Sequence, residues 1–144
     1  MSPSRGRNLI VDTGYWYALF DPRDPMAAAA RAKADTIEEF NVVLPWPTLY
    51  ETLRTRFVKN AGGTAAFERV LRRPNVTLLD DKRYRDRALD ATLEGARLGR
   101  RAISLCDMLI RLIIDDNSVR IAAVLTFNIR DFQDVCRARS VEIL

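Results

Sequence analysis

The sequence predicts an α/β protein in which helices cover both faces of a central, mostly parallel sheet of four to five strands. Short apolar runs, each the length of a buried strand, recur along the chain. Longer stretches of helical character separate these runs, as in parallel strands joined by crossover helices. The length of 144 residues and the 48% hydrophobic composition suit one domain with its own core, so we expect a single domain over residues 1–144.

Proline and glycine mark the element boundaries in the first half of the chain. Asp21-Pro22 and Asp24-Pro25 break the first helix, and Pro25 also suits the first turn of the next one. Pro45 and Pro47 end the second strand, and Ala61–Gly63 stops the helix that follows. In chain order we predict strand Asn8–Asp12, helix Thr13–Phe20, helix Met26–Glu39, strand Val42–Trp46, helix Thr48–Lys59 and helix Thr64–Leu71.

The second half continues the alternation of strands and helices. A helix after the third strand places Leu89, Leu93 and Ala96 on one face, and the glycine at position 99 closes it. A strongly apolar helix and a fourth strand follow. We predict strand Val76–Leu79, helix Asp81–Leu98, helix Ser104–Asp115, strand Ile121–Phe127, a short helix near Asp134 and edge strand Val141–Leu144.

The chain contains no histidine, and this absence excludes several chemistries. Ser-His-Asp and Cys-His nucleophile pairs, a histidine general base and histidine-ligated zinc are all ruled out. Any bound metal must have oxygen ligands, which favours Mg²⁺ or Mn²⁺. Cys106 and Cys136 form no C-x-x-C motif, and we expect both to be buried small hydrophobes, Cys106 more so because it lies in an apolar helix.

The charge balance permits a polyanionic partner. Lysine and arginine together number 23 against 19 acidic residues, a net charge of +4, and most of the bases are arginine. Arginine suits phosphate contacts, although a mildly basic surface alone accounts for the charge equally well. No apolar stretch approaches the ~18 residues of a membrane span, so we expect a cytoplasmic protein without membrane segments.

Four acids from distant parts of the chain are predicted to meet. Asp12 ends the first strand and Asp131 follows the fourth, so both lie at the carboxyl edge where open α/β sheets bind ligands. Glu51 and Asp107 are predicted in the first turns of helices that start near this edge. Carboxylates held so close repel one another unless cations neutralise them. Hard divalent cations would do so and would activate water for phosphoryl chemistry.

Each acid also has a purely structural interpretation. Thr48-x-x-Glu51 and Ser104-x-x-Asp107 match helix capping boxes, and each motif alone is more often a cap than a ligand set. Asp12 would cap the turn after its strand, and Asp131 would form an Asx-type turn. The prediction of chemistry therefore depends on the joint placement of the four acids.

Four sequence motifs together resemble those of PIN-domain proteins, in particular toxin ribonucleases of the VapC-like kind. They are L-I-V-D-T-G, T-L-Y-E-T-L, S-L-C-D-M-L-I-R and T-F-N-I-R-D-F, and they follow the family's order over nearly the whole chain. Each motif is weak alone, and the set of four is fairly specific. The resemblance implies a PIN-like three-layer fold and a Mg²⁺- or Mn²⁺-dependent endoribonuclease that hydrolyses RNA phosphodiester bonds.

The resemblance also implies site residues. The first three acids of the family's set correspond to Asp12, Glu51 and Asp107, which would hold the metal. At the family's usual fourth position this chain has Asn128, and Asp131 is the available substitute. Asn128 would still ligate through its carbonyl oxygen or bind a metal water. Small polar residues beside the acids, here Thr13 and Thr126, would bond them. Rim arginines expected to steer the RNA backbone are Arg54, Arg56, Arg111 and Arg130.

For Arg54 and Arg111, an intrahelical ion pair with the preceding acid is an equally good alternative. Tyr15, Trp16 and Tyr17 would either stack on RNA bases or pack against protein. In VapC-like toxins the early helices contribute to dimer and antitoxin contacts, so we expect a homodimer and a separate small antitoxin. Competing interpretations are a catalytically inactive PIN-type module that binds nucleic acid or protein, a different metal-dependent phosphohydrolase, and a receiver-like domain. The receiver is disfavoured because no lysine follows Lys82.

Overall fold

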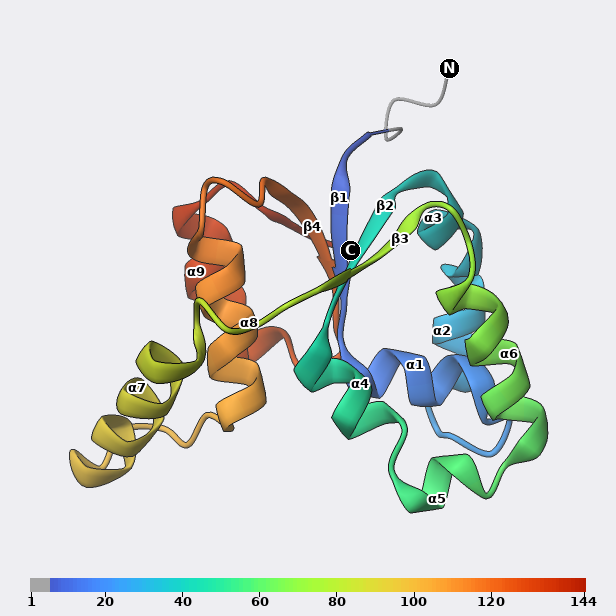
Figure 1. Cartoon of the computed structure of the whole chain (residues 1–144), viewed down its shortest axis with the longest axis horizontal. Helices are drawn as coiled ribbons and strands as arrows, with labels where there is room; N and C mark the ends of the chain where they lie inside the picture. The colour runs from blue at the N-terminus through green and yellow to red at the C-terminus, as the bar shows by residue number, and fades with distance from the viewer. Residues whose placement is uncertain (1–5) are drawn as a thin grey trace.

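The computed structural model describes residues 6–144, which form one five-stranded sheet with helices on both faces (Figure 1). The strands are β1 (Asn8–Val11), β2 (Asn41–Pro45), β3 (Val76–Leu79), β4 (Ile121–Leu125) and β5 (Glu142–Ile143). The helices are α1 (Thr13–Phe20), α2 (Ala27–Ala32), α3 (Ala34–Glu39), α4 (Trp46–Thr52), α5 (Thr55–Val58), α6 (Ala61–Leu71), α7 (Arg85–Arg97), α8 (Leu105–Asp115), η1 (Ile129–Asp131, a 3-10 helix) and α9 (Gln133–Ala138). The predicted α/β class and three layers are confirmed, and residues 1–5 of the predicted domain lie outside the described part.

The strand order explains where a site can form. The strands lie in the order β3-β2-β1-β4-β5, and every neighbouring pair is parallel. The chain therefore builds outward from β1 through β2 and β3, then returns to add β4 and β5 on the other side. β1 pairs with β4 as far as Val11↔Leu125, whereas its pairs with β2 stop at Leu9↔Val42. Ligand sites of open α/β sheets lie at the carboxyl ends of the strands where the order reverses, here between β1 and β4.

The sheet separates two hydrophobic cores, because successive residues of each strand point to opposite faces. Leu9 and Val11 of β1 pack with α1 to α6, where Trp16 and Phe67 meet edge to face at 5.3 Å. Ile10 packs on the other face with α7, α8 and α9. Burial on both faces explains why the central strands read as continuous apolar runs. Tyr15 and Trp16 are buried, so packing rather than base stacking is the outcome for these two rings.

Two helices predicted as continuous are each divided in the structure. The predicted helix Met26–Glu39 breaks at Lys33 into α2 and α3, and each part contributes a buried residue to the first core, Ala30 from α2 and Ile37 from α3. The predicted helix Thr48–Lys59 breaks where Arg54 adopts an extended backbone (ψ 166°). This turn brings Phe57 back onto Phe67 and Tyr17. In both places tertiary packing overrides local helix propensity.

The start of α6 was also predicted wrongly. The glycines expected to end the preceding helix instead lie in the first turn of α6, where the Asn60 side chain accepts a hydrogen bond from the Gly63 amide at 3.0 Å. A Cβ at Gly63 would lie 2.8 Å from Asn60 Nδ2 and 3.1 Å from the Phe20 carbonyl oxygen. Glycine is therefore needed here because α6 begins tightly against the end of α1.

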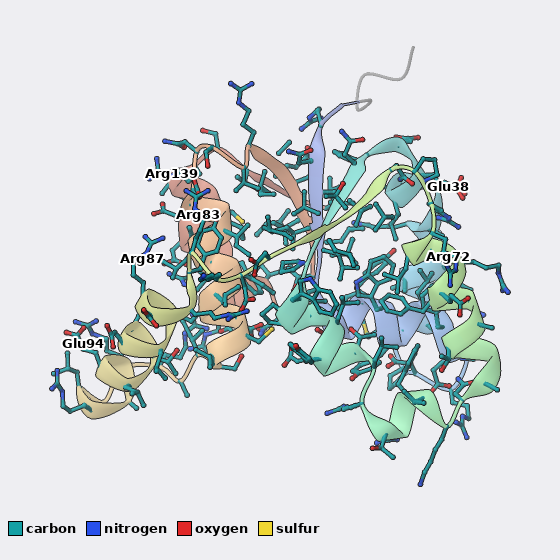
Figure 2. The ribbon with its side chains drawn as sticks, in the orientation of Figure 1. Glu38, Arg72, Arg83, Arg87, Glu94 and Arg139 are labelled. Carbon is teal, nitrogen blue, oxygen red and sulfur yellow. The ribbon has the colours of Figure 1, made fainter. Side chains whose placement is uncertain are left out.

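The face of α7 formed by Leu89, Leu93 and Ala96 is exposed. Figure 2 shows the charged side chains of Arg87 and Glu94 on the outer side of the same helix. Ala88 is the residue that α7 buries against α8. Cys106 was predicted to be the more buried of the two cysteines, and this was wrong, because Cys136 is buried and Cys106 is half-buried.

Candidate functional site

Asp12 stands at the carboxyl end of β1 and is fixed by bonds to both oxygens. Its Oδ1 accepts from the Thr13 amide at 2.9 Å, which makes Asp12 the N-cap of α1. Its Oδ2 accepts from the Thr126 hydroxyl, also at 2.9 Å, and Thr126 follows β4. Asp12 is only 9% exposed. Asp12 therefore caps the turn after its strand, as predicted. The same bonds hold its carboxylate at the point where the strand order of the sheet reverses.

Glu51 reaches the same place from α4. The Thr13 hydroxyl donates to its Oε1 at 3.0 Å, so one threonine connects two of the predicted acids. The Tyr17 hydroxyl donates to the Glu51 carbonyl and holds α4 against α1. The predicted capping box was wrong, because α4 begins at Trp46 and Glu51 lies near its end. The hydroxyl of Thr48 is buried without a hydrogen-bond partner among the described residues.

Asp107 is a residue of α8. One of the two reciprocal hydrogen bonds of the predicted capping box is present there. Ser104 is the N-cap of α8, and its hydroxyl accepts from the Asp107 amide at 3.1 Å. The Asp107 side chain is half-buried in the first turn of the helix. Asp115 and Asp116, at the other end of α8, bond instead to Arg139 and to Tyr84. These two acids therefore do not belong to the group formed by Asp12, Glu51 and Asp107.

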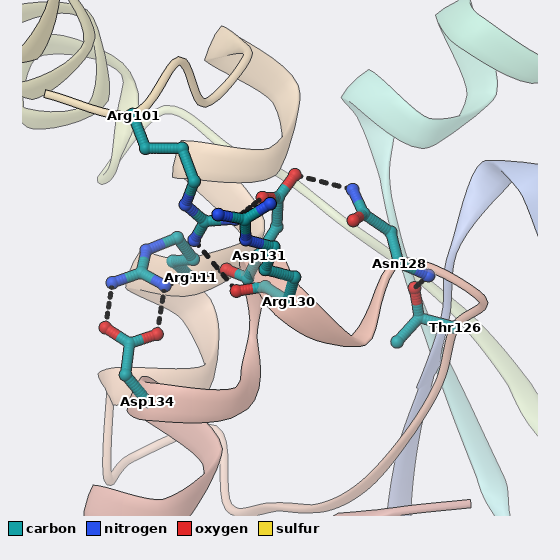
Figure 3. Close-up of polar contacts among 7 residues, drawn as sticks. All are labelled: Arg101, Arg111, Thr126, Asn128, Arg130, Asp131 and Asp134. Carbon is teal, nitrogen blue, oxygen red and sulfur yellow. Dashed lines mark hydrogen bonds and ion pairs between the residues drawn. The ribbon is translucent and has the colours of Figure 1, made fainter.

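Asp131 and Asn128 lie together in the loop after β4 (Figure 3). The Asn128 side-chain Nδ2 donates to Asp131 Oδ2. The Asn128 backbone N–H donates to the Thr126 hydroxyl at 2.9 Å. The other oxygen of Asp131 accepts from the guanidinium of Arg101, a residue that sequence reasoning missed. Stacking of Tyr15 on Phe127, with ring centroids 5.4 Å apart, ties this loop to α1.

The four acids act on one another electrostatically. Burial, then the negative charges of Asp12, Glu51 and Asp131, raise the pKa of Asp107 to about 7. Burial also raises the pKa of Asp12, against the lowering effect of its bonds from Thr126 and Thr13. The predicted convergence of the four acids at one edge of the sheet is therefore present. Among the described residues, the one ion pair to these four acids is that of Arg101 with Asp131, so the group keeps an excess of negative charge.

The donor set fits a hard divalent cation, because the site offers carboxylate, hydroxyl and amide oxygens and has no histidine. As the side chains are placed, no three acidic or cysteine groups among residues 6–144 stand at the spacing of a formed metal site. Glu51 is exposed, so its side chain is the acid with most freedom to move toward the others. Cys106 lies beside Glu51, and burial with this neighbouring charge raises the pKa of its thiol.

The arginines predicted at the rim divide into two groups. Arg111 makes a bidentate ion pair with Asp134 of α9, at 2.6 and 2.7 Å, and not with Asp107. Its guanidinium is therefore committed to holding α8 against α9. Arg54 lies over the Tyr17 ring at 5.1 Å and makes no ion pair with Glu51 or any other described acid. Arg56 lines the same hollow as Arg54, together with Tyr17 of α1 and Phe57 of α5.

Comparisons with known proteins agree with this fold. The sequence matches no protein-family model and no curated protein. The structure matches the crystal structure of Mycobacterium tuberculosis VapC20, a toxin that cleaves the sarcin-ricin loop, with a TM-score of 0.66. The match covers 88% of this chain and 94% of that chain at 18% sequence identity. The PIN-like fold predicted from the sequence motifs is confirmed, and at this identity the likeness concerns the fold alone.

Proposed function

We propose that this chain is a metal-dependent endoribonuclease that hydrolyses RNA phosphodiester bonds, with residues 1–144 forming one PIN-like nuclease domain. The observation that carries the proposal is the gathering of Asp12, Glu51, Asp107 and Asp131 at the reversal point of a parallel sheet. They come from four separate segments, and burial together with the charges of the other three acids raises the pKa of Asp107 to about 7. Perturbed acids held together in this way are a signature of functional sites.

Asp12, Glu51 and Asp107 are the proposed ligands of Mg²⁺ or Mn²⁺. Asp12 is oriented by Thr126 and Thr13, and the hydroxyl of the same Thr13 bonds Glu51, so one residue keeps the two carboxylates near each other. The fourth position, predicted at Asp131 with Asn128 beside it, supplies a carboxylate whose two oxygens already accept bonds.

The bound cation would supply a water of lowered pKa and neutralise charge on the phosphate. The chain has no histidine to act as general base, so its own part is to hold the carboxylates that would bind the cation. Without a cation the pKa of Asp107 is raised to about 7, and a bound cation would keep this carboxylate ionised. The buried Asp12 fixes the inner end of the site, and the exposed Glu51 lies on its open side.

The proposed substrate is RNA and the proposed role is that of the toxin in a toxin-antitoxin pair. Support for a protein partner, a small antitoxin or a second copy in a homodimer, comes from large apolar side chains left exposed near the site. Tyr50 of α4 is 75% exposed, and the exposed Leu89 of α7 and Leu105 of α8 line the same hollow as Tyr50. No helix among residues 6–144 is long and apolar enough to cross a membrane, and the cytoplasmic location stays a prediction.

A cleavage assay tests the proposal. Purified protein is incubated with mixed RNA in Mg²⁺, in Mn²⁺ and in EDTA, beside the variants Asp12→Asn and Asp107→Asn. Asp86→Asn is the matched control, because Asp86 also lies in the first turn of a helix but is exposed on α7. We expect metal-dependent cleavage that both site variants lose and the control keeps. RNA binding without cleavage in either metal would identify the inactive binding module instead.

A further inference from the structure

Arg101 lies in the loop between α7 and α8, outside every motif that predicted the site. Its guanidinium nevertheless reaches the loop after β4, as Figure 3 shows. Nη1 donates to Asp131 Oδ1, and Nη2 donates to the Arg130 carbonyl oxygen at 2.8 Å. The two bonds fix both position and plane of the guanidinium, because they use two different nitrogens.

These contacts belong to a continuous chain of hydrogen bonds that ends at the innermost acid. Arg101 bonds one oxygen of Asp131, and Asn128 bonds the other. The Asn128 amide donates to the Thr126 hydroxyl, which in turn donates to Asp12 Oδ2. These bonds therefore fix the position of the Arg101 guanidinium relative to the Asp12 carboxylate, which is a proposed metal ligand.

Arg101 also has N–H groups that are free to bind a ligand, which distinguishes it from Arg111. An arginine has five N–H groups, and the bonds to Asp131 and Arg130 use two of them. The Arg101 side chain is 38% exposed, so its remaining donors face solvent at the rim of the site. Arg111 is by contrast 19% exposed and held by both oxygens of Asp134 and by the Asp131 carbonyl.

We propose that Arg101 binds a phosphate of the RNA strand beside the carboxylate site. In this proposal Asp131 is a positioning residue that holds Arg101 in place, and it is not a direct metal ligand. The inference rests on the proposed ribonuclease function and deepens it. A guanidinium can form a fork of bonds to phosphate, and its charge offsets the repulsion between the phosphate and the acids. Among the described residues, Asp131 is the one acid of the four that has an ion pair, with Arg101, so its charge is already offset without a cation.

RNA binding tests the first half of the proposal independently of cleavage. The probe is a fluorescein-labelled RNA stem-loop, titrated in EDTA and followed by fluorescence anisotropy. We expect Arg101→Ala to weaken binding about tenfold, the loss of one charge-assisted bond pair, and Arg101→Lys to restore part of it. Arg100→Ala is the matched control, since Arg100 is exposed in the same loop and carries the same charge. We expect it to weaken binding less than about threefold, the effect of net charge alone.

The role of Asp131 gives a second readout. Asp131→Asn should weaken RNA binding, and the double variant with Arg101→Ala should bind no worse than Arg101→Ala alone, since both changes remove one contact. Asp131→Asn should leave Mn²⁺ affinity within about threefold, whereas Asp107→Asn should lower it by more than tenfold.

The outcomes separate the two proposals. If the wild-type protein neither binds nor cuts RNA, the ribonuclease function itself fails. If it binds RNA and Arg101→Ala behaves as Arg100→Ala does, only the assignment of Arg101 is overturned. A loss of Mn²⁺ affinity in Asp131→Asn equal to that in Asp107→Asn would make Asp131 a metal ligand and overturn its positioning role.

Discussion

Replacing Asp107 with asparagine should stabilise the metal-free protein at pH 8 while abolishing its RNA cleavage. In the folded protein, burial and the charges of Asp12, Glu51 and Asp131 raise the pKa of Asp107 from 3.8 to about 7. Below pH 3.8 the carboxyl is protonated in both folded and unfolded states. Between pH 3.8 and about 7 the unfolded chain has released the proton and the folded protein has not, so stability falls as pH rises.

The size of this effect follows from the two pKa values. About three pH units at 1.36 kcal/mol each correspond to about 4 kcal/mol of destabilisation above pH 7. The side chain is half-buried, so screening by water reduces this to about 2 kcal/mol. Asparagine also loses the favourable interaction of an acid with the first turn of α8, about 0.5 kcal/mol. The net expectation for Asp107→Asn is a gain of about 1–2 kcal/mol at pH 8.

Urea denaturation in EDTA measures the gain, followed by circular dichroism at pH 8 and at pH 4. The gain should be present at pH 8 and nearly absent at pH 4, where the wild-type carboxyl is protonated. The control Asp86→Asn changes an exposed acid that is also in the first turn of a helix and should lose up to about 0.5 kcal/mol at pH 8. Adding Mn²⁺ should stabilise the wild type and leave Asp107→Asn unchanged.

One result would refute this reasoning. If Asp107→Asn is no more stable than the wild type at pH 8, or if its gain is the same at both pH values, burial and the neighbouring acids do not raise the pKa of Asp107. The proposal that the acids await a cation would then lose its physical basis.

Three other changes test separate parts of the structure. Thr126→Val removes the hydroxyl bonded to Asp12, so the pKa of Asp12 should rise further and the pH at which Mn²⁺ binding is half lost, measured by titration at several pH values, should move upward. Ser104→Ala removes the cap of α8 and should cost about 1 kcal/mol in urea denaturation, with Ser104→Thr retaining most of the stability. Phe67→Ala empties the centre of the first core and should cost about 3–5 kcal/mol; a loss below 1 kcal/mol would contradict the packing described.

The strands and the four acids were predictable from the sequence because their signals are local. A strand buried on both faces is a continuous apolar run, and Asp12 and Thr126 directly follow two such runs. Since the carboxyl ends of parallel strands share one edge, residues far apart in the chain were placed together correctly. The capping motif at Ser104 also reports a local geometry, and it was correct.

Features that depend on packing between elements were not predictable in this way. The break at Lys33 lies in an alanine-rich stretch of high helix propensity, and no proline or glycine there marks it in the sequence. The contact between Arg101 and Asp131 joins residues 30 positions apart in the sequence. Two arginines stand side by side at positions 100 and 101, and nothing in their spacing says which of them reaches the site.

The position of a bound cation tests the central claim most directly. Crystals of the wild-type protein soaked in Mn²⁺ would be measured by anomalous diffraction at the manganese edge. The proposal predicts an anomalous peak within bonding distance of Asp12, Glu51 and Asp107, with the guanidinium of Arg101 still bonded to Asp131. Crystals in which Mn²⁺ occupies other positions and leaves these three carboxylates without a peak would contradict the metal-dependent nuclease.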